Sequence, residues 1–243
     1  MGSVHTLWSD LAPAYLKTAE SVRTGIPQAR HNYGEMGEDE LLTTLGGLHP
    51  GALSKGRALA ARYDFSSCRS VLDAAGGTGG LSIGLAEAYP GLHATIAELP
   101  GVVPLARRFV AEAGMQDRID AVAVDLLHVA VPGRFDAAVA NLLVRVLSAE
   151  EAQTAFRNAA RSIRPGGTLY VIGNVLDDSR LRPATAVRAN IAFFNFYDGG
   201  QSYTEGEHRT WLTDAGFVDI TREEEIIGIG LIRATRAGRE GRQ

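Results

Sequence analysis

The sequence has 243 residues, of which 45% are hydrophobic and 21% charged, and this length predicts one main domain with appendages. Its net charge of −4 argues against a nucleic acid partner. The first residues do not form a signal peptide pattern, and no apolar run approaches the roughly 20 residues that cross a bilayer, so we expect a cytoplasmic protein without a membrane partner. Cys68 is the only cysteine, which excludes an internal disulfide and a cysteine-based metal cluster, and we expect no bound metal.

Residues 1–65 are predicted to form helices near 5–22, 38–46 and 51–62. The glycine, proline and asparagine of "TGIPQARHNYG" indicate the loop between the first two helices. The segment carries apolar residues at helix spacing but is too short to form a core alone. We therefore expect a helical N-terminal cap that packs on its own subunit or on a second copy of the chain, and the second arrangement is a homodimer.

Residues 66–236 are predicted to form the main domain, in which apolar runs with strand character alternate with segments of helical period. The predicted strands are "SVLDAA" (70–75), "HATIAEL" (93–99), "IDAVAVDLL" (119–127), "FDAAVANLL" (135–143) and "GTLYVIGNVL" (167–176). The predicted helices between them cover 79–90, 100–114 and 148–163. This alternation predicts a parallel sheet with helices on both faces.

The C-terminal part of the chain breaks the alternation. A helix is predicted at 204–215, where "TEGE" forms a capping box on Thr204. Two strands at 217–225 and 228–236 are joined by a short turn and must be antiparallel. Residues 237–243 are expected to form a flexible tail. The prediction is an α/β fold, a doubly wound, Rossmann-like sheet of seven strands with an antiparallel C-terminal hairpin, which is the layout of class I methyltransferases.

A glycine turn, "GGTGG" (76–80), follows the first predicted strand. Such a turn places backbone N–H groups and the positive end of a helix beside a ligand. Gly77 and Gly79 fit the start of the dinucleotide motif G-x-G-x-x-G, but Ser82 stands where the third glycine belongs. Asp73 precedes the turn, where its charge would repel a pyrophosphate and attract a cation. S-adenosylmethionine (SAM) carries an ammonium and a sulfonium, so SAM is the predicted cofactor.

Two further acids follow the next two predicted strands. Glu98 ends the second strand, where a carboxylate can accept hydrogen bonds from both ribose hydroxyls. Asp125 ends the third strand, where it can accept from the adenine amino group. The predicted cofactor-binding residues are Asp73, Ala75, Gly77, Gly79, Glu98, Leu99, Asp125, Leu126 and Asn141.

Three blocks of the sequence resemble small-molecule O-methyltransferases of the caffeate and hydroxyindole type. They are "LDAAGGTGGLSIGLAEAYPGLHATIAELPGVVPLAR", "FDAAVANLLVRVLSAEEAQTAFRNAARSIRPGGTLYVIGNVL" and "YTEGEHRTWLTDAGF", and the likeness covers roughly residues 65–225. The resemblance implies SAM as methyl donor and a small aromatic or polyketide-like acceptor. It also implies that "LWSDLAPAYLKTAESVRTGIPQ" follows the place of that family's winged-helix dimerisation domain, which we expect this chain to lack.

Arg145 departs from the family pattern. The resemblance implies a histidine base in a Leu-His-Asp-Trp pattern, but "LVRVLSAEEA" has Arg145 at that position, and a guanidinium cannot accept a proton. The acid that steers the family's histidine is matched by Gly173 beside Asn174. Arg145 could bind a carboxylate or an ionised phenolate, or it could be a surface or interface arginine. His208 could replace the missing base, or it could be a solvated histidine.

The stretch "ANIAFFNFYDGGQSY" (189–203) is rich in aromatic residues and lies where the resemblance implies the acceptor pocket. We expect Asn190, Phe194 and Tyr197 to face that pocket, and the other aromatic side chains to pack in the core.

Three functions remain open at this stage. The first is SAM-dependent methylation of a small acceptor, at the oxygen of an acidic group or at carbon. The second is a SAM-binding enzyme that has lost methyl transfer and uses the sulfonium charge to steer another reaction. The third is a SAM-binding regulatory or partner subunit. Formation of S-adenosylhomocysteine (SAH) separates the first function from the other two.

Overall fold

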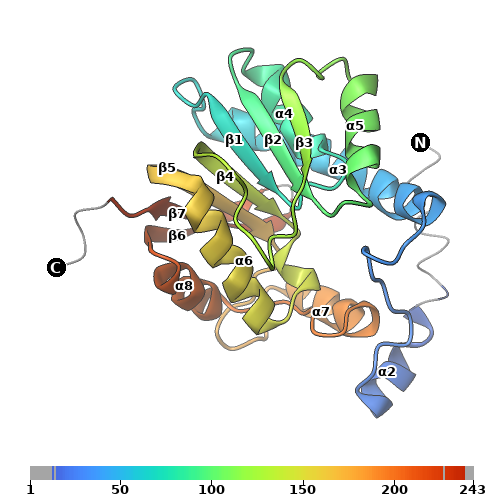
Figure 1. Ribbon diagram of the computed structural model, residues 1–243. Helices are drawn as coiled ribbons and strands as arrows, with labels where there is room; N and C mark the ends of the chain where they lie inside the picture. Colours follow the sequence, from blue (N-terminus) through green and yellow to red (C-terminus); the bar gives the residue numbers. More distant parts are fainter. Residues whose placement is uncertain (1–12, 14, 227, 239–243) are drawn as a thin grey trace.

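Seven strands form one sheet in the computed structural model, which describes residues 13, 15–226 and 228–238 (Figure 1). The strand order is β3-β2-β1-β4-β5-β7-β6. Strands β1 to β5 pair in parallel, and β7 pairs antiparallel with β5 and β6. Their bounds are Ser70–Ala74 (β1), His93–Glu98 (β2), Ile119–Ala123 (β3), Phe135–Asn141 (β4), Ile163–Gly173 (β5), Phe217–Ile226 (β6) and Ile229–Arg236 (β7). The doubly wound sheet with an antiparallel C-terminal hairpin is confirmed.

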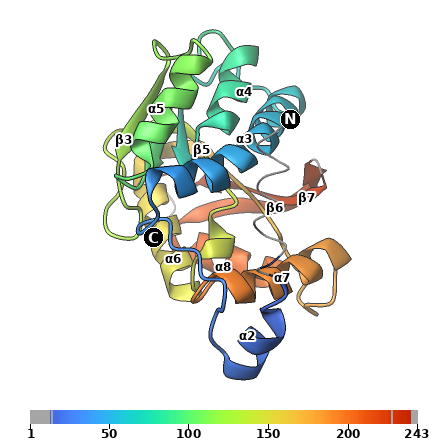
Figure 2. The same ribbon diagram turned by 90° about the vertical axis from the view of Figure 1, so that its right-hand side faces the viewer.

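Helices cover both faces of this sheet (Figures 1 and 2). One face packs against α3 (Glu38–Arg62), α4 (Gly80–Ala88) and α5 (Val103–Glu112), which contribute Leu59, Leu81 and Val110 to a shared apolar cluster. The other face packs against α6 (Ala149–Ser162) and α8 (Glu205–Asp214), which contribute Phe156 and Leu212 to a second cluster. Because β1 and β4 lie in the middle of the sheet, their side chains alternate between the two clusters.

Two strand ends differ from the sequence prediction. Strand β3 ends at Ala123, opposite Glu98 of β2, so Asp125 lies in the loop beyond the strand instead of at its end. Strand β5 begins at Ile163, before the predicted start at 167. The predicted capping box of Thr204 is confirmed: its hydroxyl accepts a hydrogen bond from the backbone of Glu207, whose carboxylate accepts one in return. Ser148 forms the same motif at the start of α6.

Helix α3 is continuous from Glu38 to Arg62, so the prediction of two helices with a break near Pro50 was wrong. Proline removes one backbone hydrogen bond and disfavours a helix interior. Here packing overrides this local penalty, because the residues before and after Pro50 are held against α4 and α5. A β-carbon on Gly56 would lie 2.2 Å from the carbonyl oxygen of Leu81, and one on Gly46 would lie 3.6 Å from Phe109.

Helix α2 (Thr18–Thr24) lies beside α7 (Ala184–Phe196) at the opposite end of the molecule from α4 (Figures 1 and 2). The Ser21 hydroxyl donates to Asn195 Oδ1 at 2.6 Å, and the backbone of His31 donates to Phe196 at 2.8 Å. The predicted helix 5–22 is thus described only in its last part, and residues 1–12 lie outside the described residues. The described part of residues 1–65 therefore lies in two places, with α2 on α7 and α3 on the sheet face.

The described residues contain no helix that is both long and apolar enough to cross a membrane. They also contain no group of three histidine, cysteine or acidic side chains arranged to hold a metal ion. The predicted tail at 237–243 falls mostly outside the described residues.

Candidate functional site

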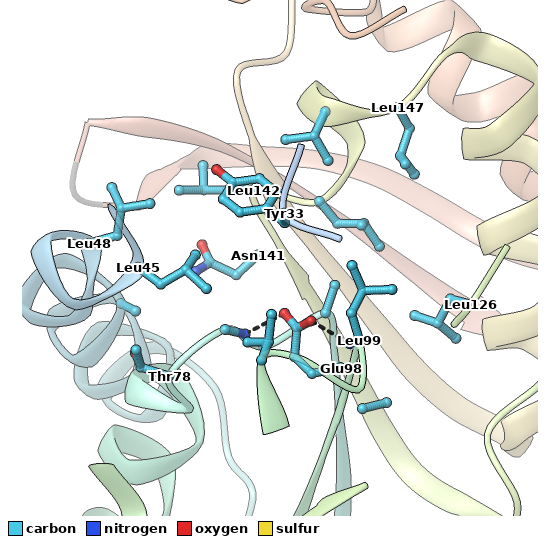
Figure 3. Close-up of a pocket in the computed structure, with 18 of the residues that line it drawn as sticks. Tyr33, Leu45, Leu48, Thr78, Glu98, Leu99, Leu126, Asn141, Leu142 and Leu147 are labelled. Carbon is cyan, nitrogen blue, oxygen red and sulfur yellow. Dashed lines mark hydrogen bonds between the residues drawn. The ribbon is translucent and has the colours of Figure 1, made fainter. Parts of the chain in front are cut away.

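A cavity of about 590 Å³ opens at the carboxyl ends of the parallel strands. Its wall comes from the loops after β1, β2, β3 and β4, from α3 and from the segment before α3. In Figure 3, Glu98 and Leu99 lie below, Tyr33 and Leu142 lie above, and Leu45 and Leu48 of α3 lie to the left. In this fold class the carboxyl edge of the sheet is where ligands bind. The predicted cofactor residues that line it are Ala75, Gly77, Glu98, Leu99, Asp125, Leu126 and Asn141.

The glycine turn after β1 is shaped by positive backbone angles at Gly77 (φ 59°) and Gly79 (φ 75°). A β-carbon on Gly79 would lie 2.3 Å from the Ile96 side chain, so the turn packs directly on β2. On its other side the turn is tied to α3, because His49 Nδ1 and Thr78 Oγ1 share a hydrogen bond of 2.8 Å. Gly79 itself does not line the cavity, so its predicted role becomes one of turn geometry.

Asp73 lies beneath this turn and is fully buried. Its Oδ2 accepts a hydrogen bond of 2.7 Å from Ser82 Oγ, while its Oδ1 has no partner among the described residues. A β-carbon on Gly76 would lie 2.5 Å from the Asp73 carboxyl carbon, so only glycine fits above it. Burial raises the pKa of Asp73 to about 6. The sequence placed this acid facing a ligand, whereas the structure places it behind the loop that forms the cavity wall.

Glu98 ends β2 and lines the cavity. Its two carboxylate oxygens accept hydrogen bonds from the backbone N–H groups of Gly77 (2.9 Å) and Leu99 (2.7 Å), which Figure 3 marks as dashed lines. Burial raises the pKa of Glu98 to about 7, and the two N–H donors oppose that rise. Glu98 therefore joins the glycine turn to the end of β2 and presents the remaining lone pairs of its carboxylate to the cavity.

Asp125 and Asn141 lie at two further places in the cavity wall. Asp125 Oδ1 accepts a hydrogen bond from the Leu127 backbone, which orders the loop after β3. Asn141 is the last residue of β4, and its buried Oδ1 has no partner among the described residues. Leu142, the next residue, has the positive φ of 60° that non-glycine residues rarely adopt. Such strain concentrates at ligand sites, which supports a binding role for the end of β4.

Arg145 also lines the cavity, on the short 3-10 helix η1 (Val144–Val146) after β4. Its guanidinium carbon lies 5.2 Å from the ring centroid of Phe193, in a cation–π contact with α7. Its buried Nε has no hydrogen-bond partner among the described residues. The structure thus gives Arg145 the geometry of a pocket residue.

Lys55 and Tyr33 are cavity residues that sequence reasoning missed. Lys55 belongs to α3, and burial together with the charge of Arg145 lowers its pKa to about 8. Tyr33 precedes α3, and its hydroxyl lies 3.2 Å from that of Tyr197. One signal could have pointed to Lys55: Lys17 and Lys55 are the only lysines among 24 basic residues.

His208 is buried on α8 rather than solvated, and it does not line the cavity. Its Nδ1 shares a hydrogen bond of 2.8 Å with the carbonyl oxygen of Thr204, and its ring lies 5.8 Å from that of Trp211. Burial lowers its pKa. Its surroundings are those of a core histidine, which leaves the base role without a geometric basis.

The three predicted acceptor residues on and after α7 do not line the cavity. Phe194 is 38% exposed, and Asn190 Oδ1 accepts a hydrogen bond from the Ser202 backbone. Tyr197 is buried and reaches the cavity only through its contact with Tyr33. Phe193 is the residue that meets Arg145, because the helical turn of α7 points it inward and Phe194 outward.

The fold and this site define a class I methyltransferase fold: a parallel sheet that ends in an antiparallel pair, a glycine turn after β1 and an acid at the end of β2. Comparison with known families agrees, because the family model of the O-methyltransferase domain matches residues 9–218. The chain belongs to this family.

Three relatives give the scale of the similarity. A 3-hydroxy-5-methyl-1-naphthoate 3-O-methyltransferase from Streptomyces sahachiroi is 30% identical over 217 residues, which cover 86% of this chain and 61% of the relative. The aclacinomycin 10-hydroxylase RdmB from Streptomyces purpurascens is 36% identical over 110 residues, which cover 45% of this chain and 29% of the relative. The crystal structure of human N-acetylserotonin methyltransferase in complex with SAM superposes with a TM-score of 0.82 at 21% identity, and the match covers 96% of this chain and 70% of that one. The chain therefore spans less than two thirds of the length of the two curated relatives.

Proposed function

We propose that this chain is a SAM-dependent methyltransferase for a small aromatic acceptor that carries an acidic group. The observation that carries the proposal is one cavity that joins the glycine turn, Glu98 and Asp125 on one side to Arg145 on the other. The residues present fit SAM. They are a glycine turn without side chains, two acids that can accept hydrogen bonds from the hydroxyl and amino groups of SAM, and Asn141, whose Oδ1 has no partner among the described residues.

The cofactor would be held by the loops after the first four strands. Glu98 would accept hydrogen bonds from the ribose hydroxyls, and Asp125 would accept from the adenine amino group. The Asn141 oxygen would accept from the ammonium group near the end of β4. When bound, SAM supplies an electrophilic methyl group on a sulfonium. Asp73 would act indirectly, by holding the glycine turn from below.

The chain's own part in the reaction would be alignment. Holding an acceptor oxygen in line with the methyl group gives a large rate advantage without any proton transfer. Arg145 would bind the acceptor's carboxylate, or keep a neighbouring phenolate ionised, because a positive charge lowers the pKa of an adjacent acid. An acceptor that arrives as an anion needs no base, which fits an arginine in the position of the family's histidine.

The relatives support an aromatic acid as the acceptor. The name of the Streptomyces sahachiroi relative gives its substrate as a hydroxylated naphthoate, which carries both a hydroxyl to methylate and a carboxylate. Methylation at oxygen is therefore favoured over methylation at carbon.

The test is SAH formation by the purified protein with SAM and a panel of hydroxylated aromatic acids, read by mass spectrometry of the methylated product. We expect activity to persist to low pH until the acceptor itself is protonated. Arg145→Lys should weaken acceptor binding more than it alters this pH profile, because lysine keeps the charge but loses the bidentate geometry. A rate that rises through an enzyme pKa near 6.5 and loses this dependence in His208→Ala would refute the mechanism.

A second function is favoured by one observation: a relative that is 36% identical over 110 residues is named a hydroxylase. In that case the fold would bind SAM and direct another reaction on an aromatic substrate. Incubation with SAM and substrate would then change the substrate without forming SAH. A regulatory subunit would do neither, and would show only SAM binding.

We also propose that the chain divides into a helical N-terminal segment (1–65), a methyltransferase domain (66–236) and a tail (237–243). We further propose that the protein works as a homodimer in the cytoplasm. The exposed apolar side chains of Leu16, Val22 and Ile26, and of Ile191 on α7, the helix that α2 contacts, support a second copy there. The single cysteine, Cys68, suits a reducing compartment. Light scattering after gel filtration tests the dimer, and cell fractionation tests the location.

A further inference from the structure

Two cations line the same cavity without an acidic partner. Lys55 comes from α3 and Arg145 from η1, and the charge of Arg145 acts on Lys55. In the part of the chain that the structure describes, neither side chain forms an ion pair. The Arg145 Nε is buried and also lacks a hydrogen-bond partner there. Both side chains are half-buried, and removing a cation from water without a counter-charge is costly.

The direction of the Lys55 side chain follows from its place on α3. Leu48, Gly51, Ala52 and Lys55 line the cavity at the spacing of one helix face. Lys55 Nζ lies 3.9 Å from the position of a β-carbon on Gly51, so the Lys55 side chain runs back along α3 toward Gly51, another residue that lines the cavity. Leucines are frequent in the cavity wall, among them Leu45, Leu48 and Leu142 (Figure 3). Lys55 is thus a half-buried cation in the wall of a largely apolar cavity.

We propose that Lys55 and Arg145 form a two-cation site that binds the carboxylate of an aromatic acid acceptor. The proposal rests on the proposed function and adds a second anchor to Arg145. Two like charges in an apolar pocket repel each other, and an anion between them removes that repulsion and pairs both. A carboxylate has two oxygens and can accept from both cations at once. Lysine suits one half of such a site because its compact ammonium can turn toward either oxygen.

A carboxylate could come from the acceptor or from the amino acid end of SAM. The contacts favour the acceptor. The glycine turn meets α3 one turn earlier, where a β-carbon on Gly80 would lie 2.9 Å from the His49 carbonyl oxygen and 3.1 Å from Ala52. Lys55 instead shares its electrostatic environment with Arg145, which follows β4 and stacks on Phe193 of α7. Arg145 therefore links the pair to α7, whereas the glycine turn contacts α3 through His49 and Ala52.

The experiment compares two probes that differ only in the carboxylate, 3-hydroxy-1-naphthoate and 2-naphthol, by calorimetry with and without SAH. Wild-type protein should bind the acid at least about 10-fold more tightly than the naphthol. Lys55→Met should weaken binding of the acid by about 10- to 100-fold, which is the usual effect of losing a charged hydrogen bond, and leave binding of the naphthol unchanged. Lys55→Arg should keep most of the wild-type affinity for the acid. Arg57→Met is the matched control, because Arg57 lies on the same helix but pairs with Glu87 at the surface.

Four results would overturn the proposal. The first is equal affinity of the wild-type protein for the two probes, and the second is an equal loss of affinity for both probes in Lys55→Met. The third is weaker SAH binding in Lys55→Met with unchanged binding of the acid. The fourth is a lower kcat in Lys55→Met with an unchanged KM for the acceptor. The third result would assign the carboxylate to the cofactor, and the fourth would make Lys55 a base. Binding is measured without turnover, so an enzyme that binds the acid as expected but forms no SAH would refute the proposed function and leave this site standing.

Discussion

Glu98 shows at the scale of a single residue how one side chain serves both fold and site. Its carboxylate fixes the backbone of Gly77 and Leu99 while it faces the cavity. An acid in this position costs stability when it is ionised, because burial disfavours the charge. The residue therefore fits a ligand that returns hydrogen bonds to it.

Replacement of Glu98 by alanine should weaken SAM binding. The variant loses two charge-assisted hydrogen bonds to the ribose and also frees the Gly77 and Leu99 backbones, so we expect a cost of about 2–3 kcal/mol. Isothermal calorimetry measures it. Asp120→Ala, at an exposed position on β3, is the control and should bind like the wild-type protein. Unchanged affinity in Glu98→Ala would contradict the ribose assignment.

The stability of the ligand-free protein should depend on the ionisation of Glu98. Its pKa is about 7 in the folded protein and 4.5 in the unfolded chain, so the folded state holds a proton that the unfolded state has released. This contribution is full below pH 4.5 and is lost as the pH rises through 7, at a cost of about 3 kcal/mol.

Glu98→Gln should remove this pH dependence. The difference in melting temperature between wild-type protein and Glu98→Gln, measured from pH 4.5 to 8, should shift in favour of the variant as the pH rises. Taking the difference cancels the contributions of His31, His49 and His208, whose lowered pKa values act in the opposite direction. A difference that stays constant over this range would contradict the raised pKa.

The contact of α3 with α4 decides stability at the scale of elements. These helices meet through glycines: a β-carbon on Gly56 would lie 2.2 Å from the Leu81 carbonyl oxygen, and one on Gly84 would lie 2.6 Å from that of Leu53. Close packing of two helix backbones lets α3 cross the sheet face and place Lys55 over the cavity. Gly56 and Gly84 are required because a side chain would not fit between the two helix backbones, and not because the backbone needs the conformation of a turn.

Gly56→Ala should lower the free energy of unfolding by about 1–3 kcal/mol, because the added methyl group meets backbone that cannot move aside. Gly51→Ala on the same helix is the matched control. Its β-carbon would meet Lys55 Nζ at 3.9 Å, and it should raise stability by about 0.5–1 kcal/mol through helix propensity. Urea unfolding curves of both variants measure the difference. Equal midpoints would show that the helices adjust without cost.

At the scale of the whole molecule, the N-terminal segment completes the cavity. Asn32, Tyr33 and Gly34 line its wall, while the glycine turn, Glu98 and Asp125 come from the sheet domain. The backbone bonds of Ala29 and His31 to the end of α7 hold this segment in place. The cavity wall thus combines stretches of the chain that lie far apart in the sequence.

Deletion of residues 1–36 should leave SAM binding within a few-fold of the wild-type protein and abolish acceptor turnover. Tyr33→Ala is the milder variant and should raise KM for the acceptor, because it removes one wall of the cavity and the partner of the Tyr197 hydroxyl. Calorimetry with SAM and an assay of SAH formation measure the two effects. Full turnover by the truncated protein would show that the segment has no part in the site.

The sequence alone determined the order of elements, the parallel sheet with its antiparallel end and the acids near the carboxyl ends of β1, β2 and β3. These are local signals: periodicity of apolar residues, glycine turns and capping boxes are written in neighbouring positions. Even Arg145 was visible from a sequence pattern, because it stands in a block with recognisable neighbours.

Only the tertiary structure decided what each of these residues faces. Packing against α4 and α5 kept α3 whole through Pro50. The fold of the glycine turn covers Asp73, and the packing of α8 buries His208 beside Trp211. The phase of α7 turned Phe193 rather than Phe194 toward Arg145, since a shift of one residue rotates a helical side chain by about 100°. Lys55 lines the same cavity as Arg145 from a position 90 residues earlier in the chain, and no local pattern encodes that placement.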